Sequence, residues 1–278
     1  MFRVEPDAVG TLSPALSLLR EACAEAAVEF FVVGAAARDL LLEHVHGVQP
    51  FRSTGDVDIA VAVEGWAGYD TLMGTLVEGH GFHRTRVEHR VTRGALVVDV
   101  VPFGDIANDR REVEWPTTDR TMSVLGYPEA FDAAVGIQIG DAPPVRVASL
   151  PGVVLLKLVA WGEAPHRRRN DPIDVCMIMM DYGEVAGDAL FDEHEDLLDD
   201  LNDMRVAYAQ ILGRDVADLL TDADLRARIL DLLRANTEDD YESPFVRAMG
   251  TECHPDFGYR LTCFRAFRHG VEKRVESG

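Results

Sequence analysis

The chain has no long hydrophobic run, few cysteines and little positive charge. None of its apolar stretches reaches the roughly 18 residues that a membrane-spanning helix needs. Residues 1–30 carry scattered acids and lack the basic start and apolar centre of a signal peptide, so we expect a cytoplasmic protein. Repeats and low-complexity linkers are also missing. With 278 residues and 47% hydrophobic content, the sequence predicts a globular protein of one large domain or two modest ones.

The four cysteines are too widely spaced for a CxxC zinc or redox motif; they are Cys23, Cys176, Cys253 and Cys263. Cys253 and His254, with Cys263 nearby, could form part of a metal site. Free thiols in a reducing compartment are the favoured interpretation.

The net charge of −21 is concentrated in one segment, 181–242, which holds 19 acidic and 5 basic residues. Such a molecule is repelled by nucleic acid on average, so any contact with nucleic acid requires a local basic patch. The acidic segment is either a solvated helical layer or a docking face for a basic partner, and the sequence leaves both open.

Apolar periodicity predicts a mixed fold. Short hydrophobic runs indicate strands at 29–34, 56–63, 95–104, 136–140 and 145–149, and an exposed, arginine-rich strand and turn is expected at 83–94. Helical spacing is found at 12–28, where Ser13 and Pro14 suit an N-cap and a first turn, and at 35–44, 66–79, 149–161, 170–183 and 260–274. We therefore expect an α/β (α+β) protein. Residues 1–150 would form a small mixed sheet flanked by helices, and residues 151–278 a helical C-terminal domain.

Three aspartates lie where a buried strand would not tolerate unpaired charge. In "RSTGDVDIAV" (52–61), Asp56 and Asp58 project from the same face because residues i and i+2 of a strand do so. Asp99 is the one acid inside the hydrophobic strand "ALVVDVVPF". Mg²⁺ converts repulsion between carboxylates into attraction, so the pattern favours a magnesium site. The alternative for the first two is a turn with ordinary surface acids.

A glycine turn precedes these acids. "VVGAAARD" (32–39) places Gly34 at the end of a strand and a helix directly after it. Backbone N–H groups at a helix start can bind phosphate, although a tight packing turn explains the glycine equally well.

The order of strand, glycine, helix with Arg-Asp, loop and then Arg-Ser-Thr-x-Asp-Val-Asp resembles the polymerase-beta-like nucleotidyltransferase superfamily. Within it, the chain is most similar to the AbiEii-type toxins of toxin–antitoxin and phage-defence systems, which include the MenT toxins. The resemblance covers about 28–182. It implies transfer of a nucleoside monophosphate from an NTP to an acceptor hydroxyl with two Mg²⁺ ions. Asp56 and Asp58 would bind both ions, and Asp99 would bind the catalytic ion and help to deprotonate the hydroxyl.

The resemblance also implies a set of nucleotide-binding residues: Gly34, Ala35, Arg38, Ser53, Thr54, Lys157 and Asp174. Many relatives carry a hydroxyl residue at the glycine turn; here Gly34-Ala35-Ala36 has none, so Ser53 and Thr54 are expected to supply it. Arg38 pairs either with Asp39 or with a phosphate.

The downstream block "KLVAWGEAPHRRRNDPIDV" (157–175) resembles a second family block, in which Lys157 would contact the triphosphate. Alternatively, Lys157 extends to solvent. Asp171 suits an N-cap, and Asp174 either serves the helix dipole or turns inward to orient Lys157 or Arg38.

The acceptor is expected to meet the basic clusters, which contain Arg84, Arg86, Arg167, Arg168 and Arg169. The resemblance favours an RNA acceptor, the end of tRNA, and a cognate antitoxin as protein partner. The runner-up is a protein or a small hydroxylated molecule, as in the aminoglycoside nucleotidyltransferases. Two rival interpretations of the same residues are a catalytically inert binding module and a metal-dependent hydrolase.

Overall fold

The computed structural model describes residues 1–49, 55–118, 120–198, 202–239 and 242–277. The chain divides into two compact units, one of Met1–Val45 and Arg52–Ser149, the other of His46–Phe51 and Leu150–Gly278. We describe each unit by itself. The predicted fold class is confirmed, because the structure combines a mixed sheet, flanking helices and a helical C-terminal part.

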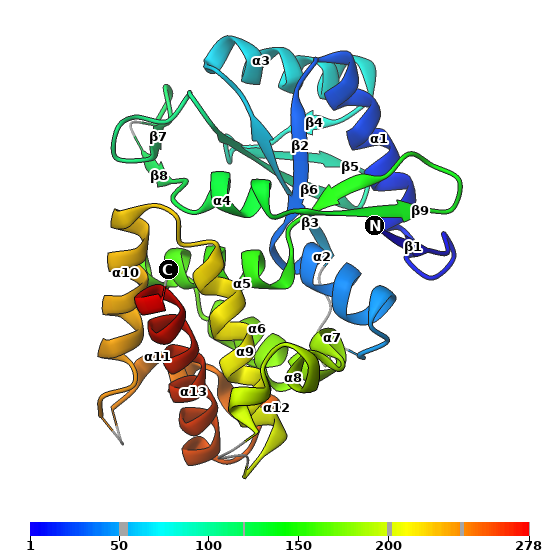
Figure 1. Ribbon diagram of the computed structural model, residues 1–278. Coiled ribbons are helices and arrows are strands. Elements are labelled where there is room, and N and C mark those ends of the chain that lie inside the picture. Colours follow the sequence, from blue (N-terminus) through cyan, green and yellow to red (C-terminus); the bar gives the residue numbers. More distant parts are fainter. Residues whose placement is uncertain (50–54, 119, 199–201, 240–241, 278) are drawn as a thin grey trace. The chain divides into compact units, whose positions relative to one another are not determined.

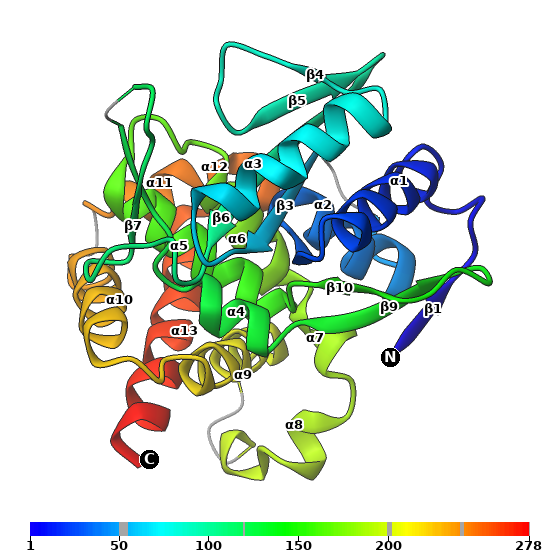
Figure 2. The same cartoon turned by 90° about the horizontal axis from the view of Figure 1, so that it is seen from above.

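The first unit is built on an eight-stranded mixed sheet with the order β1-β9-β10-β2-β3-β6-β5-β4 (Figure 1). Its strands are β1 (Phe2–Val4), β2 (Glu29–Val33), β3 (Asp56–Ala62), β4 (His83–Arg84), β5 (Arg90–Arg93), β6 (Leu96–Phe103), β9 (Val135–Ile139) and β10 (Val145–Val147). The pairs β1–β9, β10–β2 and β3–β6 are parallel, and the remaining neighbours are antiparallel. The β4–β5 hairpin and the β1–β9 pair lie at opposite edges (Figure 2). A separate two-stranded sheet consists of β7 (Glu112–Glu114) and β8 (Thr121–Ser123).

The helices of this unit are α1 (Leu12–Glu25), α2 (Gly34–Asp39), α3 (Trp66–Gly74) and α4 (Tyr127–Asp132), with π-helical η1 (Leu40–Val45) after α2 and η2 (Thr75–Gly79) after α3. The core strands are β-branched and aromatic, and residues such as Phe31, Ile59 and Val98 are fully buried. Helix α1 starts one residue before Ser13, with Thr11 in the cap position and no side-chain cap bond, so the predicted role of Ser13 is wrong.

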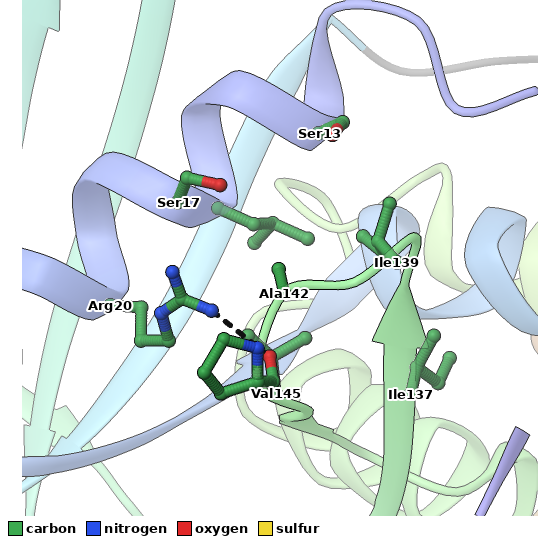
Figure 3. A pocket seen from close by; sticks show the side chains of 9 residues that line it. Ser13, Ser17, Arg20, Ile137, Ile139, Ala142 and Val145 are labelled. Atoms are coloured by element: carbon green, nitrogen blue, oxygen red, sulfur yellow. Dashed lines mark hydrogen bonds between the residues drawn. The ribbon is translucent and has the colours of Figure 1, made fainter. Parts of the chain in front are cut away.

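A hollow of about 220 Å³ lies between α1 and the strands β9 and β10 (Figure 3). Apolar side chains such as Leu16 and Ile137 line it, and Arg20 donates from Nη1 to the carbonyl oxygen of Pro143 across 3.0 Å. None of the predicted site residues lines this hollow.

The second unit is helical. Its elements are α5 (Leu150–Glu163), α6 (Asp171–Met180), α7 (Tyr182–Ala186), α8 (Ala189–Asp192), the 3₁₀ turn η3 (Glu195–Leu197), α9 (Met204–Asp218), α10 (Ala223–Ala235), α11 (Pro244–Ala248), α12 (Gly250–Cys253) and α13 (Phe257–Ser277). Helices α9 and α13 approach closely, since a Cβ at Gly213 would lie 2.0 Å from the Phe267 carbonyl oxygen. Among the described residues, no helix combines the length and the hydrophobicity needed to cross a membrane.

Two of the four cysteines form a disulfide, so the prediction of free thiols is wrong for this pair. Cys176 in α6 is joined to Cys253 at the end of α12, with their Cα atoms 6.2 Å apart. The remaining two cysteines, Cys23 and Cys263, are free and buried. Burial raises the pKa of the Cys23 thiol to about 12 and that of Cys263 to about 11, so both are poor nucleophiles.

The disulfide predicts a reductant-sensitive stability. Its two cysteines are 77 residues apart in sequence, and closing a loop of that length stabilises a protein by about 2–4 kcal/mol. We expect dithiothreitol to lower the melting temperature of the wild-type protein. The Cys253→Ser variant should melt at the lower temperature with or without reductant. Equal melting temperatures for oxidised and reduced wild type would contradict this assignment.

Candidate active site

One cross-strand row brings acidic and basic side chains together in the first unit. Asp58 of β3 is the register partner of Asp99 on the parallel strand β6, and Asp99 is the register partner of Arg90 on the antiparallel strand β5. Register partners on neighbouring strands point to the same face and lie side by side. The sheet therefore lines up Asp58, Asp99 and Arg90 across three adjacent strands.

Asp56 joins this row from two residues earlier in β3, on the same face as Asp58. Strand β2 runs antiparallel to β3 and pairs Val33 with Asp58, which places Gly34 directly against the Asp58 side chain. Gly34 has a φ of +66°, and a Cβ at this position would lie 2.3 Å from Asp58 Oδ2. Only glycine accommodates both the backbone conformation and the carboxylate.

Arg90 neutralises Asp99. Its Nε donates to Asp99 Oδ1 at 2.6 Å and its Nη2 to Asp99 Oδ2 at 2.7 Å, which is a bidentate ion pair. The same Nη2 lies 3.8 Å from Asp56 Oδ2. The hydrogen bonds to Asp99, together with the negative charges of Asp99, Asp56 and Asp58, raise the pKa of Arg90 above its usual value. The sequence predicts Arg90 only as part of a basic strand and does not identify it as the partner of Asp99.

The donor chemistry fits a divalent cation in part. Mg²⁺ is commonly held by one or two carboxylates together with substrate phosphates, and Asp56 and Asp58 on one face of β3 supply two. Asp99 is a weaker third ligand while both of its oxygens accept from Arg90, because the guanidinium already balances its charge. The described part of the chain contains no group of three or more His, Cys, Asp or Glu side chains placed to hold a metal.

The other residues of this unit that the sequence predicts to bind the nucleotide are Ala35, Arg38, Ser53 and Thr54. Ala35 lies in the first turn of α2, directly after Gly34. Arg38 is fully buried, and its Nε donates to Asp39 Oδ1 at 2.8 Å, which is the first of the two alternatives predicted for it. Ser53 and Thr54 lie outside the described residues.

Lys157 and Asp174 belong to the second unit, where they form a buried ion-pair cluster. Lys157 Nζ lies 2.6 Å from Asp174 Oδ2 and 3.1 Å from Asp171 Oδ1. Asp171 is the first residue of α6, with Asn170 in the cap position, so its predicted use as an N-cap is wrong. Asp174 turns inward to Lys157, one of the alternatives that the sequence left open.

The predicted acceptor-binding arginines are all exposed. Arg84 and Arg86 lie in and after β4, at the edge of the sheet of the first unit. Arg167, Arg168 and Arg169 lie in the turn between α5 and α6 of the second unit. No acidic partner within salt-bridge distance is described for any of these five residues.

No protein-family model matches the chain, and the search of curated proteins gives no match. Among solved structures, the solution structure of the antibiotic-resistance factor ANT(2'')-Ia matches at 15% identity and a TM-score of 0.38, over 67% of this chain and 94% of that one. Its crystal structure with adenylyl-2''-tobramycin matches at 18% identity and a TM-score of 0.34, over 55% and 77%. An antigenic nucleotidyltransferase-like protein from Paracoccidioides brasiliensis matches at 17% identity and a TM-score of 0.38, over 62% and 75%.

The close approach of Gly34 to Asp58 predicts a specific cost for a side chain at position 34. Gly34→Ala meets both the positive φ, which costs about 1–2 kcal/mol, and the Asp58 carboxylate, where overpacking costs a further ~1–3 kcal/mol. Gly94→Ala is a matched control, because Gly94 has a φ of +61° and a Cβ there would have no heavy atom within 4 Å. Chemical denaturation should show a larger loss of stability for Gly34→Ala. Equal losses would mean that Asp58 does not occupy the described position.

The Lys157 cluster predicts a large difference between the two lysines of the chain. Lys157→Met removes a cation that contacts two buried carboxylates, and breaking a buried pair in this way costs about 3–5 kcal/mol. Lys273→Met removes a cation from an exposed helix surface, where a pair such as that with Glu276 is worth about 1 kcal/mol or less. Urea denaturation measures both values, and a small effect at Lys157 would contradict the buried cluster.

Proposed function

We propose that the protein is a metal-dependent nucleotidyltransferase that transfers a nucleoside monophosphate from an NTP to an acceptor hydroxyl. The observation that carries the proposal is the pairing of Asp58 with Asp99 on adjacent parallel strands, with Asp56 on the same face. Three carboxylates gathered on one face of a sheet repel one another, and this arrangement is useful where a cation and a triphosphate are to be bound. The sequence resemblance to the polymerase-beta-like superfamily supports the same activity.

In this proposal, Asp56 and Asp58 would hold Mg²⁺. Once Arg90 has released it, Asp99 would accept the proton of the acceptor hydroxyl as the hydroxyl oxygen bonds to the α-phosphorus of the NTP and pyrophosphate leaves. Bound Mg²⁺ supplies charge neutralisation of the triphosphate and activation of the hydroxyl. Asp99 would hold a second ion once Arg90 has released it. Gly34 lets the chain pass close to Asp58 and leaves the backbone of Gly34 and Ala35 available to a phosphate. The roles of Ser53, Thr54, Arg38, Lys157 and Asp174 toward the nucleotide stay predictions from the resemblance.

For the acceptor we propose RNA, with tRNA ends as the first candidate. Arg84 and Arg86 are exposed at an edge of the same sheet that carries the aspartates, and exposed arginines bind phosphates. The exposed Arg167, Arg168 and Arg169 are further candidates for phosphate contacts. Action as the toxin of a toxin–antitoxin system, with an antitoxin docked on the acidic segment 181–242, follows from the resemblance. A protein, an antibiotic-like small molecule and an inert binding module are the alternatives to be tested.

Transfer of label tests the proposal directly. Wild-type protein is incubated with Mg²⁺ and each α-³²P-labelled NTP, together with total RNA, a protein extract or a set of aminoglycosides. We expect label on RNA from the wild type and a loss of at least 100-fold in Asp58→Asn, because removal of one electrostatic stabiliser of a transition state costs about 10²–10³ in rate.

Asp70→Asn is the matched control, since Asp70 is an exposed acid in α3 of the same unit. It should keep wild-type activity. If only aminoglycosides or only proteins become labelled, the proposed RNA acceptor is wrong and the labelled molecule is the acceptor. Release of free nucleoside monophosphate without any labelled acceptor would make the protein a hydrolase, and no reaction with any NTP would favour the inert module.

A further inference from the structure

Arg90 occupies an unusual position on the acidic face. It is the first residue of β5, and the pairing of β5 with β6 sets it directly beside Asp99. Its guanidinium also lies 3.8 Å from Asp56, which extends from β3, the next strand beyond β6. A single cationic side chain thus contacts carboxylates from two strands, in the place where a cation shared by Asp56 and Asp99 would have to bind.

The ion pair between Arg90 and Asp99 opposes the binding of a metal ion to Asp99. Both oxygens of Asp99 accept from Arg90 in a bidentate pair, the strongest form of carboxylate–guanidinium hydrogen bonding. A divalent cation bound to the same oxygens would stand next to a permanent positive charge. Arg90 therefore competes with a metal ion for Asp99, because its positive charge lowers the affinity of this carboxylate for a second cation.

The two partners differ in their access to solvent. The Arg90 side chain is 36% exposed, whereas the Asp99 side chain is 14% exposed. The Arg90 side chain can therefore rotate toward solvent while Asp99 stays in the sheet. A guanidinium that has left a carboxylate can form the same paired hydrogen bonds with two oxygens of a phosphate.

We propose that Arg90 is a positioning residue that keeps divalent metal off Asp99 and gives Asp99 up when its guanidinium transfers to a phosphate group. The phosphate is that of a nucleotide or of a nucleic acid acceptor, and the chemistry of recognition is the same for both. This inference rests on the proposed metal site. It adds that Asp99 becomes available to a metal ion only when a phosphate group has taken up Arg90.

The first test is metal affinity without any phosphate, measured by Mn²⁺ titration with EPR detection. We expect Arg90→Gln to bind Mn²⁺ at least ten-fold more tightly than wild type, or to bind one ion more. Arg93→Gln is the matched control, because Arg93 ends the same strand, is exposed and has Leu96 rather than an acid as its register partner. It should match the wild type. In an Asp99→Asn background, Arg90→Gln should no longer change the affinity.

The second test adds inorganic tripolyphosphate to the metal-free protein and follows its binding by calorimetry. We expect binding to wild type and to Arg93→Gln, and a loss of at least ten-fold in Arg90→Gln. Repeating the titration with a short RNA oligonucleotide lacking a triphosphate distinguishes the two sources of phosphate. Arg90→Lys, which keeps the charge without the bidentate geometry, should give intermediate values in both tests, and thermal melting confirms that each variant is folded.

Equal or weaker Mn²⁺ binding by folded Arg90→Gln and Arg90→Lys, compared with a wild type that binds Mn²⁺, would overturn the inference alone. Absence of Mn²⁺ binding in all variants would overturn the metal site and the inference with it. If the Arg90 effects are found but no nucleotide transfer is detected, the inference stands and the proposed activity fails.

Discussion

The pairing of β3 with β6 is the constraint on which the acidic face depends. Because these two strands are parallel and in register at Asp58 and Asp99, the carboxylates are brought together by the backbone hydrogen bonds of the sheet rather than by a loop. Moving either strand by one residue would turn its acid to the opposite face. The hydrophobic residues on both sides of each acid, such as Val57 and Val98, fix the register because they fill the core.

The charge on this face is balanced within the sheet. A row of two acids and one base across three strands places the positive charge of Arg90 beside Asp99 and near Asp56, which lowers the repulsion between the carboxylates. Gly34 contributes space rather than charge, since any side chain there would displace Asp58. The ion pair with Arg90 thus explains how three acids are accommodated at the centre of a sheet whose central residues are otherwise mostly apolar.

Much of this arrangement could be predicted from the sequence, and the reasons are local. The strands at 29–33, 56–62 and 96–103 are dense apolar runs, and the acids stand out inside them. Strands β1, β7 and β8 and helix α4 were not predicted, because three-residue strands and a six-residue helix depend on their neighbours more than on their own composition. The disulfide links cysteines 77 residues apart, which no spacing rule reveals. The Arg90–Asp99 pair could have been predicted from the sequence. If Gly94 and Ala95 form a two-residue hairpin turn, the residues on either side pair in order, and Arg90 lies opposite Asp99.

The Lys157 cluster and the Arg90 cluster differ in the solvent exposure of the cationic side chain, which decides whether that cation can be exchanged. Lys157 contacts Asp171 and Asp174 with a side chain only 10% exposed, so removing it would strand two buried charges. Arg90 contacts Asp99 and Asp56 with a side chain 36% exposed, and Asp56 is itself 48% exposed, whereas Asp99 is 14% exposed. The cost of separating a pair falls as its partners become solvated. Lys157 is therefore suited to holding α5 against α6, and Arg90 to a contact that changes when a phosphate binds.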